Sequence, residues 1–130
     1  NKTWGGEFEV EFFEDWKKVL KSKIEEYKIV HLTMYGEDFE STTPKIPTDV
    51  PIAVVVGGAK VPGEIYKLAN YNIAVGHQPH SEVAALALFM CEIMGGVAGS
   101  EHFSGARLEV KPHPSGKVVI DHDDDSDASQ

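Results

Sequence analysis

The sequence has one cysteine, one arginine and no long apolar run, and each shortage excludes a class of protein. Cys91 alone cannot form an internal disulfide, which is typical of a reducing compartment, so we expect a cytoplasmic protein. The longest apolar stretch, residues 83–91, has nine residues, whereas a membrane span needs about 18. The N-terminus (NKTWGGEFE) has no apolar region of a signal peptide. We therefore expect no membrane association.

Positive charge is also scarce, and the net charge of −9 argues at first against a nucleic-acid partner. Five of the acidic residues lie in the last ten residues, DHDDDSDASQ, and without them the remaining chain carries −4. A run of like charge at a terminus is typical of disordered, solvated sequence. We predict a disordered acidic tail over residues 121–130, so the acidity describes the main domain only in part.

Hydrophobic periodicity predicts alternating strands and helices over the rest of the chain. Alternation over residues 8–12 indicates a half-buried strand, and residues 14–27 have the spacing of an amphipathic helix. The remaining predicted elements are strands at 29–34, 52–56 and 72–75, helices at 62–69 and from Ser81 to Met94, a proline-rich irregular segment at 37–51, and a hairpin at 106–111 and 117–120. This order predicts an α/β fold with a mainly parallel sheet and a C-terminal β-hairpin.

The helix that follows Ser81 is apolar nearly all round. Such a helix has to be buried on several sides, so it packs either in the core or against a second subunit. Ser81 can cap its N-terminus, and Gly95 and Gly96 can end it.

Three loops follow the predicted parallel strands, after Leu32, after Val56 and after Val75. Ligands of such sheets bind outside the carboxyl ends of the strands, so all three loops are candidates for one site. The second loop, GGAKV, is neither a phosphate-binding P-loop nor a dinucleotide fingerprint. Its paired glycines allow either close approach of a ligand to the backbone or simply a tight turn.

The third loop, VGHQPHSE, contains two histidines three residues apart. A zinc site would use His77, His80 and a third ligand such as Glu82, but the HExxH pattern is absent. The alternative is that these residues form a turn that caps the helix. Ser81 lacks the G-x-S-x-G context of a nucleophile. The residues alone thus predict a pocket at the strand ends and no particular reaction.

Three segments in order are similar to the archaeal tRNA (cytidine-56) 2′-O-ribose methyltransferases of the SPOUT superfamily. They are IVHLTMYG (29–36), VVVGGAKVP (54–62) and ANYNIAVGHQPHSEVAALALF (69–89). The resemblance covers about residues 4–120 and implies one SPOUT methyltransferase domain over residues 1–120. That fold is a deep trefoil knot, which is among the rare exceptions to unknotted topology.

The resemblance implies an S-adenosylmethionine pocket made by the knotted loops. Carried onto this sequence, the cofactor contacts are Leu32, Gly57, Gly58, Ala59, Lys60, Val61, Val75, Gly76, His77, Gln78, Pro79, His80, Ser81 and Glu82. The family usually has asparagine at the position of His77. No metal is implied.

The reaction implied is methylation of a ribose 2′-hydroxyl in the TΨC loop of tRNA by a homodimer, with RNA rather than DNA as the substrate. The family's arginine-bearing motif belongs to an N-terminal segment that the printed sequence lacks, so we assign no catalytic residue. Arg107 is not given that role. The alternative is a catalytically incomplete module that binds S-adenosylmethionine and RNA through the same knotted pocket.

Overall fold

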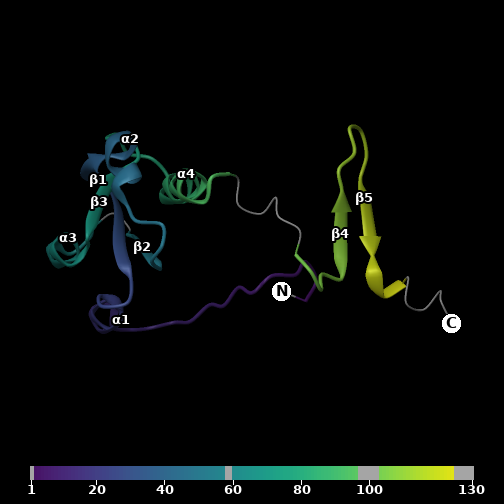
Figure 1. The fold of residues 1–130 in the computed structure, drawn as a ribbon, viewed down its shortest axis with the longest axis horizontal. Helices are drawn as coiled ribbons and strands as arrows, with labels where there is room; N and C mark the ends of the chain where they lie inside the picture. Colours follow the sequence, from purple (N-terminus) through teal and green to yellow (C-terminus); the bar gives the residue numbers. More distant parts are fainter. Residues whose placement is uncertain (1, 58–59, 97–102, 125–130) are drawn as a thin grey trace. The chain divides into compact units, whose positions relative to one another are not determined.

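The computed structural model describes residues 2–57, 60–96 and 103–124, which fall into two units (Figure 1). The larger unit comprises residues 13–98, and the smaller comprises residues 1–12 and 99–130. Every helix in the described ranges is too short or too polar to cross a membrane.

The larger unit is built on a parallel sheet of three strands in the order β2-β1-β3. They are β1 (Lys28–Asp38), β2 (Ile52–Val56) and β3 (Tyr71–Ala74). β1 pairs with β2 from Lys28 opposite Ile52 to Leu32 opposite Val56. The parallel α/β sheet predicted from the β-branched runs is therefore confirmed. β2 is only half-buried, less than its uniformly apolar sequence predicts.

β1 extends beyond its predicted end at residue 34. A bulge interrupts its pairing with β3, and the pairing resumes after the bulge. Leu32 lies opposite Ile73, and after the bulge Glu37 lies opposite the same residue. Residues 33–36 thus leave the ladder before the strand resumes. Gly36 permits the return, because a Cβ there would lie 2.5 Å from the carbonyl carbon of Asn72.

Helices connect and cover these strands. They are α1 (Trp16–Lys23), α2 (Phe39–Thr42), α3 (Gly63–Leu68) and α4 (Glu82–Met94), with a short 3₁₀ turn, η1 (Thr43–Lys45), after α2. α1 is shorter than predicted, because Asp15 caps it by accepting from Lys17 N at 3.1 Å and the chain turns after Lys23. The proline-rich segment contains α2 and η1, since Pro44 fits the first turn of a helix.

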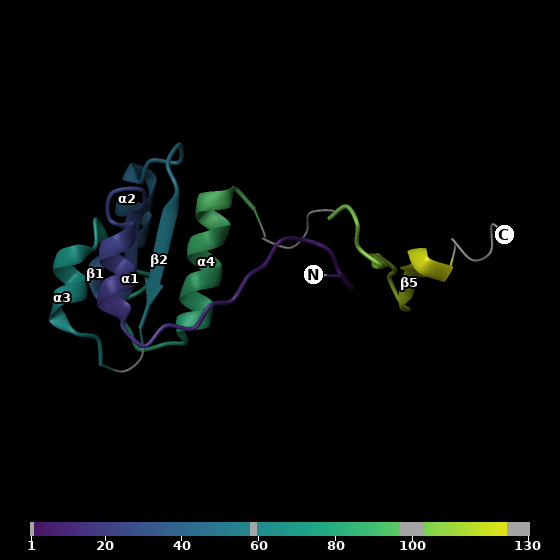
Figure 2. The same cartoon turned by 90° about the horizontal axis from the view of Figure 1, so that it is seen from below.

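The core lies between the sheet and α4. Its buried members are Val30, Leu32, Ile46, Ile73, Ala85 and Phe89. Figures 1 and 2 both show α4 on one side of the sheet and α3 on the other. The predicted caps of α4 are confirmed: Ser81 Oγ accepts from Ala84 N at 3.4 Å, and Gly95 has the left-handed φ of 72°.

The smaller unit contains the predicted hairpin, formed by β4 (Leu108–Lys111) and β5 (Val118–Asp121). The strands are antiparallel, with Leu108 opposite Asp121 and Lys111 opposite Val118. Asp121, the first residue of the predicted acidic tail, is the last residue of β5, and its carboxylate accepts from Arg107 Nη2 at 2.9 Å. Residues 125–130 of that tail lie outside the described residues.

The strand predicted for residues 8–12 is wrong. None of the β-ladders formed by the described residues includes this segment, and Val10 and Phe12 are 62% and 93% exposed. Alternation of apolar and polar residues shows that one face can be buried, but a strand forms only where a neighbouring edge accepts its hydrogen bonds.

Candidate functional site

A cavity of about 600 Å³ lies where the three parallel strands end. The segments after Leu32, Val56 and Val75 all contribute to its wall, so the three loops meet at one site as the sequence predicts. Its lining comprises Leu32, Thr33, Met34, Tyr35, Val56, Gly57, Lys60, Val61, Tyr66, Val75, Gln78, Pro79, His80, Glu82 and Ala85.

Most residues that the family resemblance implies as cofactor contacts reach this cavity. Those in the lining are Leu32, Gly57, Lys60, Val61, Val75, Gln78, Pro79, His80 and Glu82. Gly76, His77 and Ser81 belong to the same loop but are not part of the lining. Gly58 and Ala59 lie outside the described residues.

The β1 bulge supplies a wall that the sequence did not indicate. Thr33, Met34 and Tyr35 line the cavity because they have left the ladder with β3. Thr33 Oγ1 lies 2.9 Å from the hydroxyl of Tyr66, another lining residue, so α3 is tied to the bulge. A bulge of this kind has no simple sequence signal, although Gly36 marks a close backbone approach.

The second wall depends on a close approach within the loop after β2. A Cβ at Gly57 would overlap Cγ2 of Val61, so a larger residue at this position would force the Val61 side chain to move. This close approach within the loop is consistent with a tight turn at Gly57. It also brings Lys60 and Val61 to the cavity.

The third wall is fixed by hydrogen bonds within the loop that leads to α4. Gly76 has a φ of 77°, which places the turn directly after β3. His80 Nε2 contacts the carbonyl oxygen of Val75, and its Nδ1 lies 3.1 Å from the carbonyl of Ser81. Both contacts lie within the segment that leads into α4, where Glu82 lies beside the positive end of the helix dipole.

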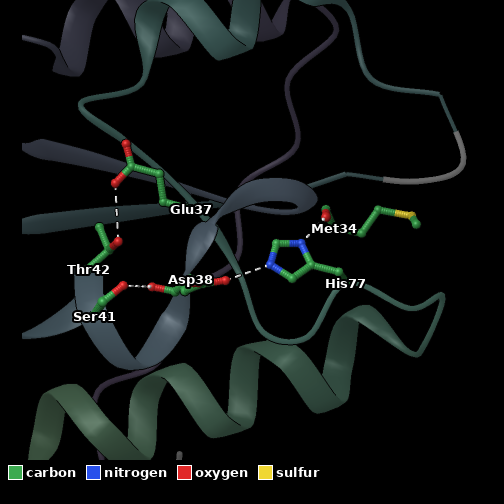
Figure 3. A network of polar contacts seen from close by, with 6 residues as sticks. All are labelled: Met34, Glu37, Asp38, Ser41, Thr42 and His77. Atoms are coloured by element: carbon green, nitrogen blue, oxygen red, sulfur yellow. Dashed lines mark hydrogen bonds and ion pairs between the residues drawn. The ribbon is translucent and has the colours of Figure 1, made fainter.

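His77 is not part of the cavity lining, and its ring lies between Met34 and Asp38 of β1 (Figure 3). Its Nδ1 lies 3.0 Å from the carbonyl oxygen of Met34, and its Nε2 lies 2.8 Å from Oδ1 of Asp38. The hydrogen bond to Asp38, followed by that to Met34, raises the pKa of His77 above its ordinary value. His77 thus contacts oxygens of β1, whereas His80 contacts carbonyl oxygens of its own segment. The described residues contain no cluster of three metal-binding side chains.

A buried polar network lies next to the bulge in β1. His31 is fully buried, and its Nδ1 lies 2.9 Å from Oδ1 of Asn72, whose Nδ2 donates to the carbonyl of Tyr66 at 3.0 Å. Asn72 Oδ1 is thus an acceptor, so Nδ1 of His31 carries the proton. Among the described residues no hydrogen-bond partner faces His31 Nε2. Burial lowers the pKa of His31, so the ring is neutral.

The finished cavity combines apolar walls with a few polar groups. Leu32, Val61 and Val75 present hydrocarbon surface, whereas Gln78 and Glu82 present an amide and a carboxylate. A volume of this size and a lining of this mixture are typical of sites for small molecules and cofactors.

Comparison with known proteins shows to which proteins the chain is similar. The family model described as "tRNA ribose 2′-O-methyltransferase, aTrm56" matches residues 4–120. The tRNA (cytidine(56)-2′-O)-methyltransferase of Nitrosopumilus maritimus is 47% identical over 120 residues, covering 92% of this chain and 68% of the relative. The proteins of the same name from Thermococcus kodakarensis and Methanocaldococcus jannaschii are 45% and 43% identical, and the aligned parts cover 67% and 68% of those relatives and 90% and 92% of this chain.

Proposed function

The chain belongs to the tRNA ribose 2′-O-methyltransferase family that matches residues 4–120, and we propose that it methylates the 2′-hydroxyl of cytidine 56 in tRNA with S-adenosylmethionine as the donor. The observation that carries this proposal is the cavity at the strand ends, because the sequence segments that resemble the family are the ones that surround it. Membership implies a methyl donor, and the cavity is its proposed place.

The residues of the cavity fit that donor. Leu32, Val61 and Val75 would enclose the adenine ring, and the backbone of the loops after β2 and β3 would offer hydrogen-bonding groups to it. Glu82 would bring negative charge to a cationic ligand. The volume of about 600 Å³ lies within the usual range for sites of small cofactors.

The chemistry needs little from the protein beyond alignment and the exclusion of water. S-adenosylmethionine supplies a methyl group already activated on a positively charged sulfur. Residues of the bulge (Thr33, Met34 and Tyr35) and of the third loop (Gln78, Pro79 and His80) line the cavity and would orient the reacting groups in line. Arg107 takes no part in this proposal, and its guanidinium pairs with Asp121 in the smaller unit.

Several finer features belong to the same proposal. We infer a deep trefoil knot, one methyltransferase domain over residues 1–120 and work in the cytoplasm, where tRNA is modified. We also infer a homodimer, supported by the apolar surface of α4, where Val83, Leu88 and Met94 are 76%, 56% and 51% exposed.

Methyl transfer to defined transcripts tests the reaction. We expect the chain to transfer labelled methyl groups to an unmodified archaeal tRNA transcript, and to lose transfer when cytidine 56 carries a 2′-deoxyribose. A matched transcript with a 2′-deoxyribose at another TΨC-loop position should remain a substrate. Transfer to the 2′-deoxycytidine 56 transcript would contradict the proposed acceptor.

The same assay, together with binding measurements, distinguishes the enzyme from the alternative of a catalytically incomplete binding module. Binding of S-adenosylmethionine and of tRNA, without methyl transfer at any enzyme concentration, would favour that module over the enzyme. Failure to bind S-adenosylmethionine would contradict both.

A further inference from the structure

We propose that His77 is a positioning residue whose doubly protonated ring fastens the loop at residues 76–81 to the end of β1, so that the cavity wall is held at low pH and released as pH rises. His77 is not part of the cavity lining. Its proposed role is to hold lining residues, such as Met34 and Gln78, in position. The effect on the methyl donor rests on the proposed function, whereas the fastening of the loop does not.

The two partners of His77 determine its protonation. The carbonyl oxygen of Met34 and the carboxylate of Asp38 are both acceptors, at 3.0 Å from Nδ1 and 2.8 Å from Nε2 (Figure 3). A neutral imidazole has one N–H and one lone pair, so it can donate to only one of them and turns its lone pair toward the other oxygen. Only the imidazolium donates to both. Loss of the proton therefore breaks one of the two bonds.

Charged residues lie on the elements around this loop. Asp38 is the charge that raises the pKa of His77, and Glu37 on β1, Glu40 on α2 and Glu82 at the start of α4 are further acidic residues. The carboxylate of Glu37 accepts from Thr42 Oγ1 at 3.2 Å and points away from His77 in Figure 3. His80, on the same loop, binds the carbonyls of Val75 and Ser81, and η1 adds Lys45.

The bonds of His77 join two walls of the cavity. Met34 lines the cavity from the β1 bulge, and the residue after His77, Gln78, lines it from the third loop. The bond from His77 to the backbone of Met34 therefore fixes the spacing of these walls. Its bond to Asp38 anchors the same ring where β1 meets α2.

Asp38→Asn separates protonation from hydrogen bonding. The amide of asparagine can donate to Nε2 of a neutral His77 while Nδ1–H still donates to Met34. This variant should keep the loop fastened but remove its dependence on pH. Glu40→Gln is the matched control, because it removes the same charge two residues further along the chain and leaves both partners of His77 in place.

Nitrogen NMR of the histidine rings tests the protonation without any cofactor. We expect both ring nitrogens of His77 to carry protons at pH 6.5 in the full chain and in Glu40→Gln, and its titration to lie above the ordinary value of 6.5. In Asp38→Asn the pKa of His77 should fall toward or below that ordinary value. A His77 that titrates at or below 6.5 in the full chain, or equally in both variants, would overturn the proposal.

Amide exchange and ligand affinity test the consequence. Protection factors of residues 76–78 should fall between pH 6 and pH 8.5 in the full chain and stay constant in Asp38→Asn. The affinity for S-adenosylhomocysteine should weaken about two- to fivefold over the same range in the full chain only, as expected for loss of an exposed ion pair. Parallel pH profiles in both proteins would overturn the inference. Absence of S-adenosylhomocysteine binding in every protein would instead contradict the proposed function, because the exchange data stand without it.

Discussion

At the scale of single residues, the absence of a side chain at Gly36 shapes the cavity as much as any side chain does. A Cβ there would lie 2.5 to 2.6 Å from backbone atoms of Asn72 and Ile73, and a backbone cannot rotate aside. This residue lets β1 bulge outward through residues 33–36 and then resume its pairing with β3. The wall formed by Thr33, Met34 and Tyr35 depends on that return.

Gly36→Ala should therefore lower the free energy of unfolding by about 2–4 kcal/mol. Gly63→Ala is the matched control, because nothing lies within 4 Å of a Cβ there and it occupies the first turn of α3, where alanine is favoured. Urea denaturation of both variants measures the difference. Equal stability of the two variants would contradict the close approach of β1 to β3.

His31 should make the stability of the larger unit depend on pH. Its pKa is lowered in the folded protein by burial, so the unfolded chain binds more protons below the ordinary value of 6.5. Stability should consequently fall as pH decreases below 6.5, with a slope of at most about 1.4 kcal/mol per pH unit from this residue. His31→Asn should flatten this part of the profile, whereas His113→Asn in the hairpin should not. An unchanged slope in His31→Asn would exclude this origin.

At the scale of elements, capping residues and β-branched runs were sufficient to predict most of the larger unit. Ser81 and Gly95 delimit α4 as expected, and the run at 52–56 forms β2. The bulge in β1 was not predictable, because it arises where one strand meets the backbone of another that is distant in sequence. The contacts of the His77 ring with Met34 and Asp38 were not predictable for the same reason, because these residues come together only in the folded chain.

The exposed surface of α4 predicts self-association. Leu88 and Met94 are 56% and 51% exposed on a helix that is apolar nearly all round. Leu88→Glu would place a charge in a buried interface, so we expect sedimentation velocity to show a dimer for the unchanged chain and a monomer for this variant. Glu92→Gln, on the same helix, should remain dimeric. A monomer for the unchanged chain at micromolar concentration would contradict the proposed homodimer.

At the scale of the whole molecule, charge opposes the proposed RNA partner. The net charge is −9, and two of its aspartates, Asp125 and Asp127, lie in the last six residues. The negative charges of the protein repel the negatively charged phosphate backbone of RNA, and salt screens that repulsion.

Asp125→Asn combined with Asp127→Asn should therefore bind tRNA more tightly than the unchanged chain at 50 mM salt. The affinities of the two proteins for tRNA should become similar at 300 mM salt, where screening is stronger. Ser126→Ala with Ser129→Ala is the control for a change in the same segment without a change in charge. A difference that persists at high salt would show that the aspartates act by some means other than long-range repulsion.

The most direct test of the account uses the three methionines of the chain, Met34, Met90 and Met94. Met34 lines the cavity, whereas Met90 and Met94 lie on α4 away from its lining. Methyl NMR of methionine-labelled protein during titration with S-adenosylmethionine should show a saturable shift of the Met34 signal and far smaller shifts of the other two. No saturable shift at Met34, or saturation only at Met90 and Met94, would contradict the assignment of the methyl donor to the cavity at the strand ends.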